Sequence, residues 1–450
     1  MKDVLKDTVF LKNIGKLFGS SFIAQLIPFA ALPVLTRIYS PEDFGFWAYF
    51  LSLSGVISIV MTGNYEFAIV LPKDDSEALN VTLGSISLVV FIFALTLFTL
   101  PFFSGIISES AGLSEGAVQF TVWISVMSLS MALFRIAGFW NNRNNRFGRM
   151  GAGNISRSAS ASTIQLFNGF YFDVNYSGLA AGSVLGYFTG FLFLSGDLIK
   201  QSIREWKNIT PRSVMQVLKR YKKFPKYFMP SEFMNFLSSN VPVIFLTNVF
   251  NAGITGLYAV PHKFINTPMT MLGSSISQAY FKKSNDIKNS GGDLGPVTSD
   301  IYRKLMNLGI VPISVVAAYG DYIFAFLLGD KWEISGIYAS LIAPWMLMVF
   351  VASPISIVFA TLELQEISLK LNSFLLFIRI LSFVIGGFVF KSAMIAIFLY
   401  GASGFVYWLY FSFYVIKVSG GDRSGIVKFS ISRLVFIMLP IILSRIILNV

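Results

Sequence analysis

Five basic residues lie inside apolar stretches of this sequence and are its side chains most capable of specific chemistry. They are Arg135, Arg157, Lys263, Arg379 and Arg445. A charge inside a bilayer costs about 2.5 to 3.5 kcal/mol on insertion scales, so it needs either a role or a route to the surface. Guanidinium and ammonium groups bind phosphates and carboxylates. The set therefore predicts a site for an anion.

Lys263 and Arg379 are the deepest of these cations. Counted from the ends of their apolar stretches, they lie about 13 and 16 Å deep at 1.5 Å per residue. Lys263 follows the single histidine, His262, and both stand between Pro261 and Pro268, which are expected to bend a helix and free backbone carbonyls. We predict that Lys263, Arg379 and His262 line a binding cavity. A neutralising salt bridge inside the membrane is the competing explanation for the cations, and a hydrogen-bonded structural role is the competing one for His262.

Arg135 and Arg157 lie near the ends of their apolar stretches, and one further arginine, Arg37, and two carboxylates lie close to such ends. Arg37, Arg135 and Arg157 would add positive charge to the same cavity, although the long side chains of Arg135 and Arg157 also reach lipid headgroups. Glu66 and Asp321 are candidates for carrying a coupling proton or pairing with a cavity cation. The alternative for both carboxylates is a helix-end charge in contact with water.

Composition excludes several kinds of catalytic site. The 450 residues include no cysteine and one histidine, which rules out disulfides, zinc clusters and most histidine-based triads. No segment matches a phosphate-binding GxxxxGK[ST] loop. We therefore expect no metal and no cofactor, and we expect any transport to draw on an ion gradient, the membrane potential or the substrate's own gradient.

Thirteen apolar segments are long enough to cross a bilayer. Hydrophobic residues make up 54% of the chain and charged residues 13%, against about 25% charged in soluble domains. A span needs about 20 apolar residues. The segments lie near 17–36, 43–62, 79–103, 117–140, 154–172, 178–198, 226–249, 254–280, 301–328, 335–360, 368–390, 392–416 and 429–449.

These segments predict an all-α polytopic membrane protein with two halves. We expect an N-terminal lobe at 1–198, comprising a short interfacial helix and six spans, then a basic cytoplasmic linker at 199–225. A C-terminal lobe of six spans follows at 226–416, and 417–450 hold a basic link and an extra apolar helix. Residues 38–48 (IYSPEDFGFWA) and 249–259 (VFNAGITGLYA) form a weak internal repeat between the first and second span of each half.

The loop charges orient the chain. With the N-terminus in the cytoplasm, inside segments hold 27 of the 35 basic residues and outside loops hold only Arg37, Lys331 and Lys391. This distribution accounts for the net charge of +12 without nucleic acid as a partner. Glycines 178, 182, 186 and 190, spaced by four, predict a helix face that a neighbouring helix approaches closely.

Three segments carry a resemblance to a known family. PVLTRIYSPEDFGFWA (33–48), GLYAVPHKFINTP (256–268) and LLGDKWEISGIYASLIAP (327–344) resemble the bacterial polysaccharide transporters and O-antigen flippases of the multidrug/oligosaccharidyl-lipid/polysaccharide exporter superfamily. The resemblance implies two six-helix lobes in a V around a central cavity whose cations receive a diphosphate or acidic sugars. It implicates Arg37 and Lys263. The thirteenth segment departs from the 12 or 14 spans expected of the family.

We therefore predict a flippase of the bacterial inner membrane, not an enzyme, that moves an undecaprenyl-diphosphate-linked oligosaccharide to the outer leaflet by alternating access. The cargo would be an O-antigen unit of lipopolysaccharide or a similar surface glycan. Membrane lipids and other surface-glycan assembly proteins are the remaining expected partners. Three other classes stay open, one of them a non-transporting scaffold for glycan assembly, which the cations buried at mid-membrane depth disfavour. A drug or cation exporter of the same superfamily would favour acidic cavity residues, and a membrane glycan polymerase or ligase would favour a large outside loop, whereas the longest one here is near 104–116.

Overall fold

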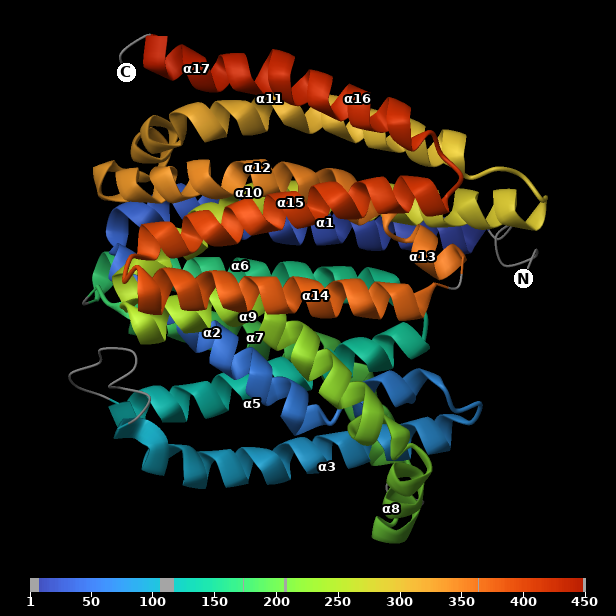
Figure 1. Ribbon diagram of the computed structural model, residues 1–450. Coiled ribbons are helices and arrows are strands. Elements are labelled where there is room, and N and C mark those ends of the chain that lie inside the picture. Colours follow the sequence, from blue (N-terminus) through green and yellow to red (C-terminus); the bar gives the residue numbers. More distant parts are fainter. Residues whose placement is uncertain (1–7, 106–116, 173, 206–208, 363, 448–450) are drawn as a thin grey trace. The chain divides into compact units, whose positions relative to one another are not determined.

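The fold is described by a computed structural model that covers residues 8–105, 117–172, 174–205, 209–362 and 364–447 (Figure 1). This part of the chain is mostly helical and contains no strand, which confirms the predicted all-α class. The first seven residues of the expected interfacial helix and most of the predicted outside loop at 104–116 lie outside the described residues. Packing groups the chain into two compact units, Met1–Gly256 and Leu257–Val450.

The helices of the first unit follow the predicted spans. They are α1 (Thr8–Ile38), α2 (Pro41–Thr62), η1 (Tyr65–Val70), α3 (Asp75–Thr99), η2 (Leu100–Phe103), α5 (Ala117–Arg143), α6 (Phe147–Tyr171), α7 (Tyr176–Arg204), α8 (Pro211–Arg220), η4 (Phe224–Phe228) and α9 (Met229–Val249). Because α9 packs against α2, it belongs with the first unit although it follows the basic linker. The lobe boundaries predicted at 199–225 stay a prediction.

The second unit begins within α10 (Ala252–Asn289). It continues with α11 (Gly295–Leu328), η5 (Asp330–Trp332), α12 (Glu333–Ile355), α13 (Val358–Thr361), α14 (Gln365–Val384), η6 (Ile385–Val389), α15 (Ala393–Val418), α16 (Arg423–Arg433), η7 (Leu434–Met438) and α17 (Leu439–Ile447). Pro261 and Pro268 lie inside α10, which runs through both as one helix.

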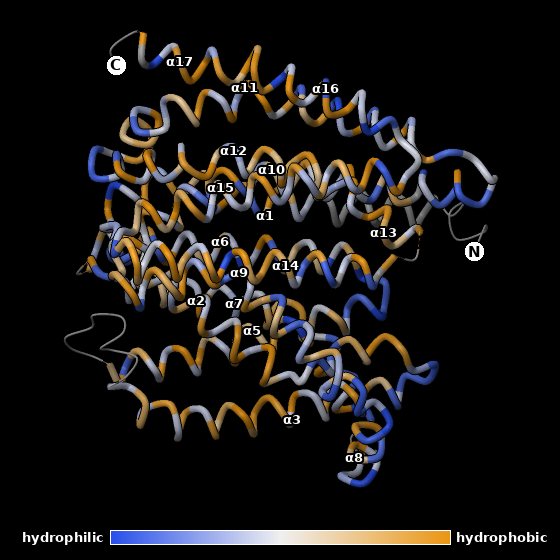
Figure 2. The backbone as a smooth tube through the Cα atoms, in the orientation of Figure 1, coloured by the Kyte–Doolittle hydropathy of each residue, from blue (hydrophilic) through white to orange (hydrophobic). Residues whose placement is uncertain are grey.

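Each of the thirteen predicted spans coincides with a helix, and within the described residues ten helices are long and apolar enough to cross a membrane. The tenth is Arg423–Arg445, so the extra C-terminal segment meets the same criteria as the others. The three helices that fall short are α6, α9 and α10, although each has at least 21 residues. Polar side chains distributed along them lower their hydropathy; α3, by contrast, is largely hydrophobic along its length (Figure 2).

Glycines fix the position of α6 against α7. A Cβ at Gly182 would lie 2.8 Å from the Ala161 carbonyl oxygen of α6, and one at Gly186 would lie 2.7 Å from the Arg157 carbonyl oxygen. Because a glycine has no side chain, the backbone of α7 comes close to the backbone and the short side-chain atoms of α6 at these positions. The predicted close approach of a neighbouring helix is confirmed at Gly182 and Gly186, with α6 as the neighbour.

The two repeated junctions contact each other reciprocally. Gly45, near the start of α2, lies against Ala252 of α10, and Gly256 of α10 lies against Pro41 of α2. Gly45 matches Gly256 in the repeat, and Pro41 matches Ala252. The helix caps match as well: Ser40 Oγ accepts the Asp43 amide at 3.1 Å. Its counterpart, Asn251, accepts the Ile254 amide through Oδ1 at 2.8 Å. This symmetry supports the internal repeat.

The C-terminal helix is attached to α11 at a kink. Tyr319 has non-helical backbone angles inside α11, and its hydroxyl lies 2.7 Å from Ser444 Oγ of α17. Next to it, Arg445 Nη2 donates to Asp321 Oδ2 at 2.5 Å, and Arg445 Nη1 donates to the Ala318 carbonyl at 3.0 Å. Because the kink leaves helix carbonyls without their usual donors, the arginine satisfies backbone and carboxylate together.

Candidate substrate-binding site

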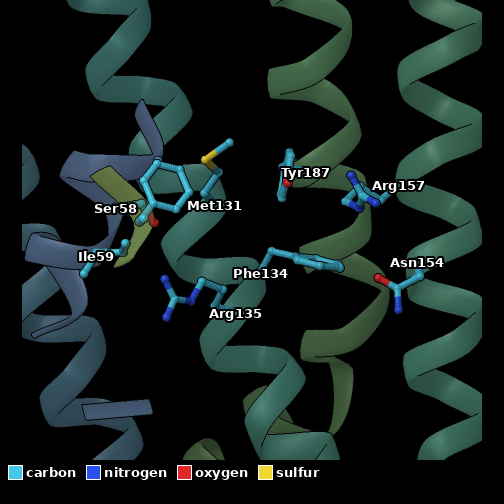
Figure 3. Close-up of a pocket in the computed structure, with 10 residues that line it drawn as sticks. Ser58, Ile59, Met131, Phe134, Arg135, Asn154, Arg157 and Tyr187 are labelled. Carbon is cyan, nitrogen blue, oxygen red and sulfur yellow. The ribbon is translucent and has the colours of Figure 1, made fainter. Parts of the chain in front are cut away.

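A hollow of about 260 Å³ in the first unit contains two of the predicted cations (Figure 3). Arg135 enters it from α5 and Arg157 from α6. The remaining lining residues come from α2, α5, α6, α7 and α9; they are Gly55, Ser58, Ile59, Met131, Phe134, Asn154, Tyr187 and Phe236. An adjoining hollow of about 210 Å³ shares Phe134, Arg135 and Asn154 with it. The two hollows together make one cationic recess.

Arg135 is neutralised on one side by a buried carboxylate. Its Nη2 lies 2.5 Å from Glu66 Oε1 and 3.4 Å from Asn64 Oδ1. Gly63 and Asn64 adopt the left-handed conformation, with φ near +55°, and this turn places Glu66 of η1 under α5. Glu66 is fully buried whereas the Arg135 side chain is 28% exposed. Burial raises the pKa of the Glu66 carboxyl, and the Arg135 charge opposes that rise. The pair has no net charge while both are ionised.

Arg157 is not neutralised in this way. Its guanidinium carbon lies 4.8 Å from the centre of the Tyr187 ring and 5.8 Å from that of Phe134, both within cation–π range. Among the described residues its side chain forms a single hydrogen bond, a long one of 3.5 Å to Ser158 Oγ. It forms no ion pair with any residue that the structure describes, and its Nε is buried without a hydrogen-bond partner. Arg157 therefore supplies the uncompensated positive charge of the recess.

In the second unit, two of the predicted residues meet in an aromatic cluster. The guanidinium of Arg379 lies 5.9 Å from the Trp345 ring and 5.7 Å from the Tyr400 ring. His262 stacks between Tyr258 and Trp345, with ring centres 5.6 and 6.0 Å away. The three partner rings are almost fully buried. The cluster holds the deep Arg379 by aromatic faces rather than by a carboxylate.

The other predicted residues lie elsewhere. Lys263 is exposed on α10, and its carbonyl accepts a hydrogen bond from Thr267. Arg37 is exposed at the end of α1 and donates to the Pro33 carbonyl at 2.9 Å. Asp321 pairs with Arg445 at the α11 kink. Of the two carboxylates, Glu66 therefore pairs with a cation of the recess and Asp321 does not. Site roles for Lys263, Arg379, Arg37, His262 and Asp321 stay predictions.

The sequence contained a signal for the site that charge alone missed. Phe134, Asn154 and Tyr187 line the recess, yet none is a charged residue within an apolar stretch. The low hydropathy of three predicted spans is the signal that points to these sites. Of these spans, α6 supplies Asn154 and Arg157 to the recess, α9 supplies Phe236, and α10 lines a further hollow in the second unit. Each of the three helices that fall short of the hydropathy criterion thus contributes residues to the wall of a hollow.

Comparison with known proteins agrees with this architecture. The sequence profile of a family described as "Polysaccharide biosynthesis protein" matches residues 34–336. Among solved structures, "Lipid II flippase MurJ, inward closed conformation" superposes with a TM-score of 0.71 at 16% identity, over 95% of this chain and 92% of that one. An inward-facing multidrug resistance MATE family transporter of the MOP superfamily gives 0.58 at 13% identity, over 92% and 95%.

The outward-facing form of a MATE family transporter also matches, with a TM-score of 0.54 at 12% identity over 93% of this chain and 96% of that one. No curated protein matches this sequence significantly. At these identities the structural matches establish the fold, which is that of the MOP-superfamily transporters. With the family profile covering two thirds of its length, this multi-pass membrane protein belongs to the polysaccharide biosynthesis protein family.

Proposed function

We propose that the protein is a flippase that carries an undecaprenyl-diphosphate-linked oligosaccharide from the inner to the outer leaflet of the bacterial cytoplasmic membrane. It has no enzymatic step in this proposal, its N-terminus is cytoplasmic, and the cargo is a surface-glycan unit such as that of O-antigen. The family, concerned with polysaccharide biosynthesis, and the fold, shared with a lipid II flippase, support this function. The observation that carries it is the uncompensated charge of Arg157 in the recess.

The recess suits a diphosphate on a lipid. Arg157 presents a planar cation over the Tyr187 ring, and the nitrogen donors of a guanidinium match the oxygens of a phosphate. Tyr187 and Phe134 hold that cation away from bulk water, which strengthens its attraction for an anion. Asn154 adds an uncharged amide beside it. A diphosphate carries more negative charge than Arg157 alone neutralises, so a second cation is needed.

Glu66 provides a means of supplying that second cation. While Glu66 is ionised, it holds Arg135 at 2.5 Å. When Glu66 takes up a proton, Arg135 keeps its charge and becomes available to the diphosphate. Burial, which raises the pKa of Glu66, favours that protonation. We propose that substrate binding and protonation of Glu66 occur together, so that a proton gradient is coupled to transport through this pair.

The recess disfavours a drug or cation exporter. Among the described residues, Glu66 is the carboxylate that forms an ion pair with a lining residue, and that residue is the cation Arg135. An organic cation entering the recess would therefore meet Arg157 first and be repelled. We retain a single function for this reason.

The test is translocation of lipid-linked oligosaccharide, extracted from the source organism, in vesicles containing purified protein. Arg157→Gln removes the free charge, and we expect translocation to fall about 10- to 100-fold, because a charge-assisted hydrogen bond contributes about 1.5 to 3 kcal/mol. Arg157→Lys keeps the charge without the planar fork and is expected to retain part of the activity. Translocation by Arg157→Gln at the native rate would overturn the proposal.

Arg149→Gln is the matched control. Arg149 lies on the same helix two turns earlier, pairs with Asp197 and does not line the recess. It removes the same charge from α6 without changing the site, so its translocation rate should stay close to that of the native chain. A loss equal to that of Arg157→Gln would indicate an effect of net charge rather than of the recess.

A further inference from the structure

A third hollow, of about 240 Å³, lies between α10 and α12 in the second unit. At about 30 Å³ per water molecule it holds on the order of eight waters, which is roughly the bulk of one sugar ring. Its lining has no charged residue and consists of Asn266, Met269, Thr270, Gly273, Ser274 and Ser277 from α10, with Val349, Phe350, Ser353 and Pro354 from α12. Its chemistry therefore differs from that of the arginine recess.

One face of α10 is polar along the length of this hollow. Asn266, Thr270, Ser274 and Ser277 recur at helical spacing, so they lie above one another, and Thr270 and Ser274 are exposed. Leu272 is 47% exposed on the opposite face of the same helix. A row of exposed amide and hydroxyl groups is not stable against hydrocarbon. The polar face therefore borders water or a polar ligand, while the Leu272 face suits lipid.

The polar groups leave both donors and acceptors for a ligand. Thr270 Oγ1 donates to the Thr267 carbonyl at 2.9 Å and Ser274 Oγ to that of Met271 at 3.2 Å, so both hydroxyl oxygens remain acceptors. The side chains of Asn266, Ser277 and Ser353 form no hydrogen bond within the part of the chain that the structure describes, and their donors remain available.

Opposite the polar row, α12 contributes a largely apolar wall to the hollow. Phe350 and Pro354 are buried beneath the polar row and offer the flat apolar surface that the C–H face of a sugar packs against. Gly273 brings α10 close to α12, since a Cβ there would lie 3.3 Å from Pro354 Cγ. Uncharged donors and acceptors over an apolar floor are the groups that recognise a neutral sugar.

We propose that this hollow binds one neutral sugar ring of the glycan, separately from the arginine recess that receives the diphosphate. The assignment rests on the proposed function, because it takes the glycan to be part of the cargo. In this assignment two sites bind two chemically different parts of the cargo. Charged groups in the first unit bind the constant lipid diphosphate, and hydroxyl and amide groups on α10 recognise the variable sugar.

The lack of cysteine makes a direct test straightforward. Ser274→Cys and its control Leu272→Cys each introduce a single thiol, one on the polar face of α10 and one on the opposite face. With the protein in vesicles, a water-soluble maleimide should label Ser274→Cys at least about tenfold faster than Leu272→Cys, because the reagent enters only from water. Equal labelling of the two variants, or no labelling of Ser274→Cys, would overturn the proposal.

Protection from labelling then identifies the ligand. We expect the lipid-linked saccharide fraction of the source organism to slow labelling of Ser274→Cys severalfold, and bare undecaprenyl diphosphate to leave it unchanged. Equal protection by both, or by neither, would overturn the sugar assignment. Adding Arg157→Gln to the Ser274→Cys variant separates the two proposals. If translocation is lost while maleimide still labels Ser274→Cys at its usual rate, both proposals are supported. If translocation stays at the native rate, the proposed function is contradicted, and the difference in labelling between Ser274→Cys and Leu272→Cys still tests the hollow.

Discussion

The reciprocal contact between α2 and α10 predicts that Gly45 and Gly256 do not tolerate a methyl group. A Cβ at Gly45 would lie 1.7 Å from the Ala252 carbonyl oxygen, and one at Gly256 would lie 1.8 Å from the Pro41 carbonyl oxygen. Real Cβ contacts essentially never fall below 3.0 Å. Each alanine therefore has to part the helices by about 1.3 Å, and no side-chain rotation can relieve the clash because the obstructing atoms are backbone.

The expected cost follows from two opposing contributions. Overpacking typically costs about 1 to 3 kcal/mol, and we take the upper end because backbone has to move. Replacing glycine by alanine within a helix returns about 1 kcal/mol. We thus expect Gly45→Ala to lose about 2 kcal/mol of unfolding free energy, and Gly256→Ala to lose about the same. At about 2.1 cal/mol/K of unfolding entropy per residue, a loss of about 2 kcal/mol lowers the Tm of a chain of 450 residues by about 2 °C.

Thermal unfolding of the purified protein in detergent would measure this loss. The double variant should be scarcely less stable than either single one, since the displacement that admits one methyl also admits the other. Gly138→Ala is the matched control: it lies in α5 with nothing within 4 Å of its built Cβ, so its Tm should stay level or rise. The reciprocal contact would be refuted if Gly45→Ala had the same Tm as Gly138→Ala. It would also be refuted if the double variant lost twice as much Tm as either single variant.

Three further predictions concern the buried ion pairs. Arg135→Gln leaves Glu66 buried without its partner and should lower the unfolding free energy by up to about 3 kcal/mol, measured as Tm against Glu66→Gln/Arg135→Gln, which should recover much of the loss. Because burial raises the Glu66 pKa, the stability of Arg135→Gln should be greatest at acid pH and fall as pH rises through that pKa, whereas the double variant should show no such slope. Arg445→Gln, which strands the nearly buried Asp321, should destabilise more than Asp321→Asn; the reverse order would show that the kink does not depend on the carboxylate.

The spans were predictable from sequence because their signal is length and hydropathy. A helix occurs at each of the thirteen predicted positions, including 154–172, 226–249 and 254–280, which are the least apolar. What composition could not show is why those three are polar. Hydropathy is an average over one segment. The recess, in contrast, depends on which face of α6 packs against α7, and the glycines that determine this packing belong to α7.

The candidate site was only partly predictable for a related reason. Depth along a span favoured Lys263 and Arg379 over Arg135 and Arg157, because depth was measured one helix at a time. In the folded unit Arg135 and Arg157 share a recess, and Lys263 is exposed on α10. The pairing of Glu66 with a cation was foreseen among its alternatives, but the identity of that cation depends on the left-handed turn at Gly63 and Asn64. Long-range packing decides such partners.

The contact between α6 and α7 also bears on how the chain enters the membrane. α6 falls short of the hydropathy of a membrane span, and packing against neighbouring helices covers part of its polar surface. α7 follows it closely in the sequence and meets the length and hydropathy criteria of a span, and the glycines at 182 and 186 let the two helices approach closely. We expect α6 to be integrated as half of a helical hairpin with α7, so that bulky substitutions on the glycine face would first appear as a failure of membrane integration during synthesis.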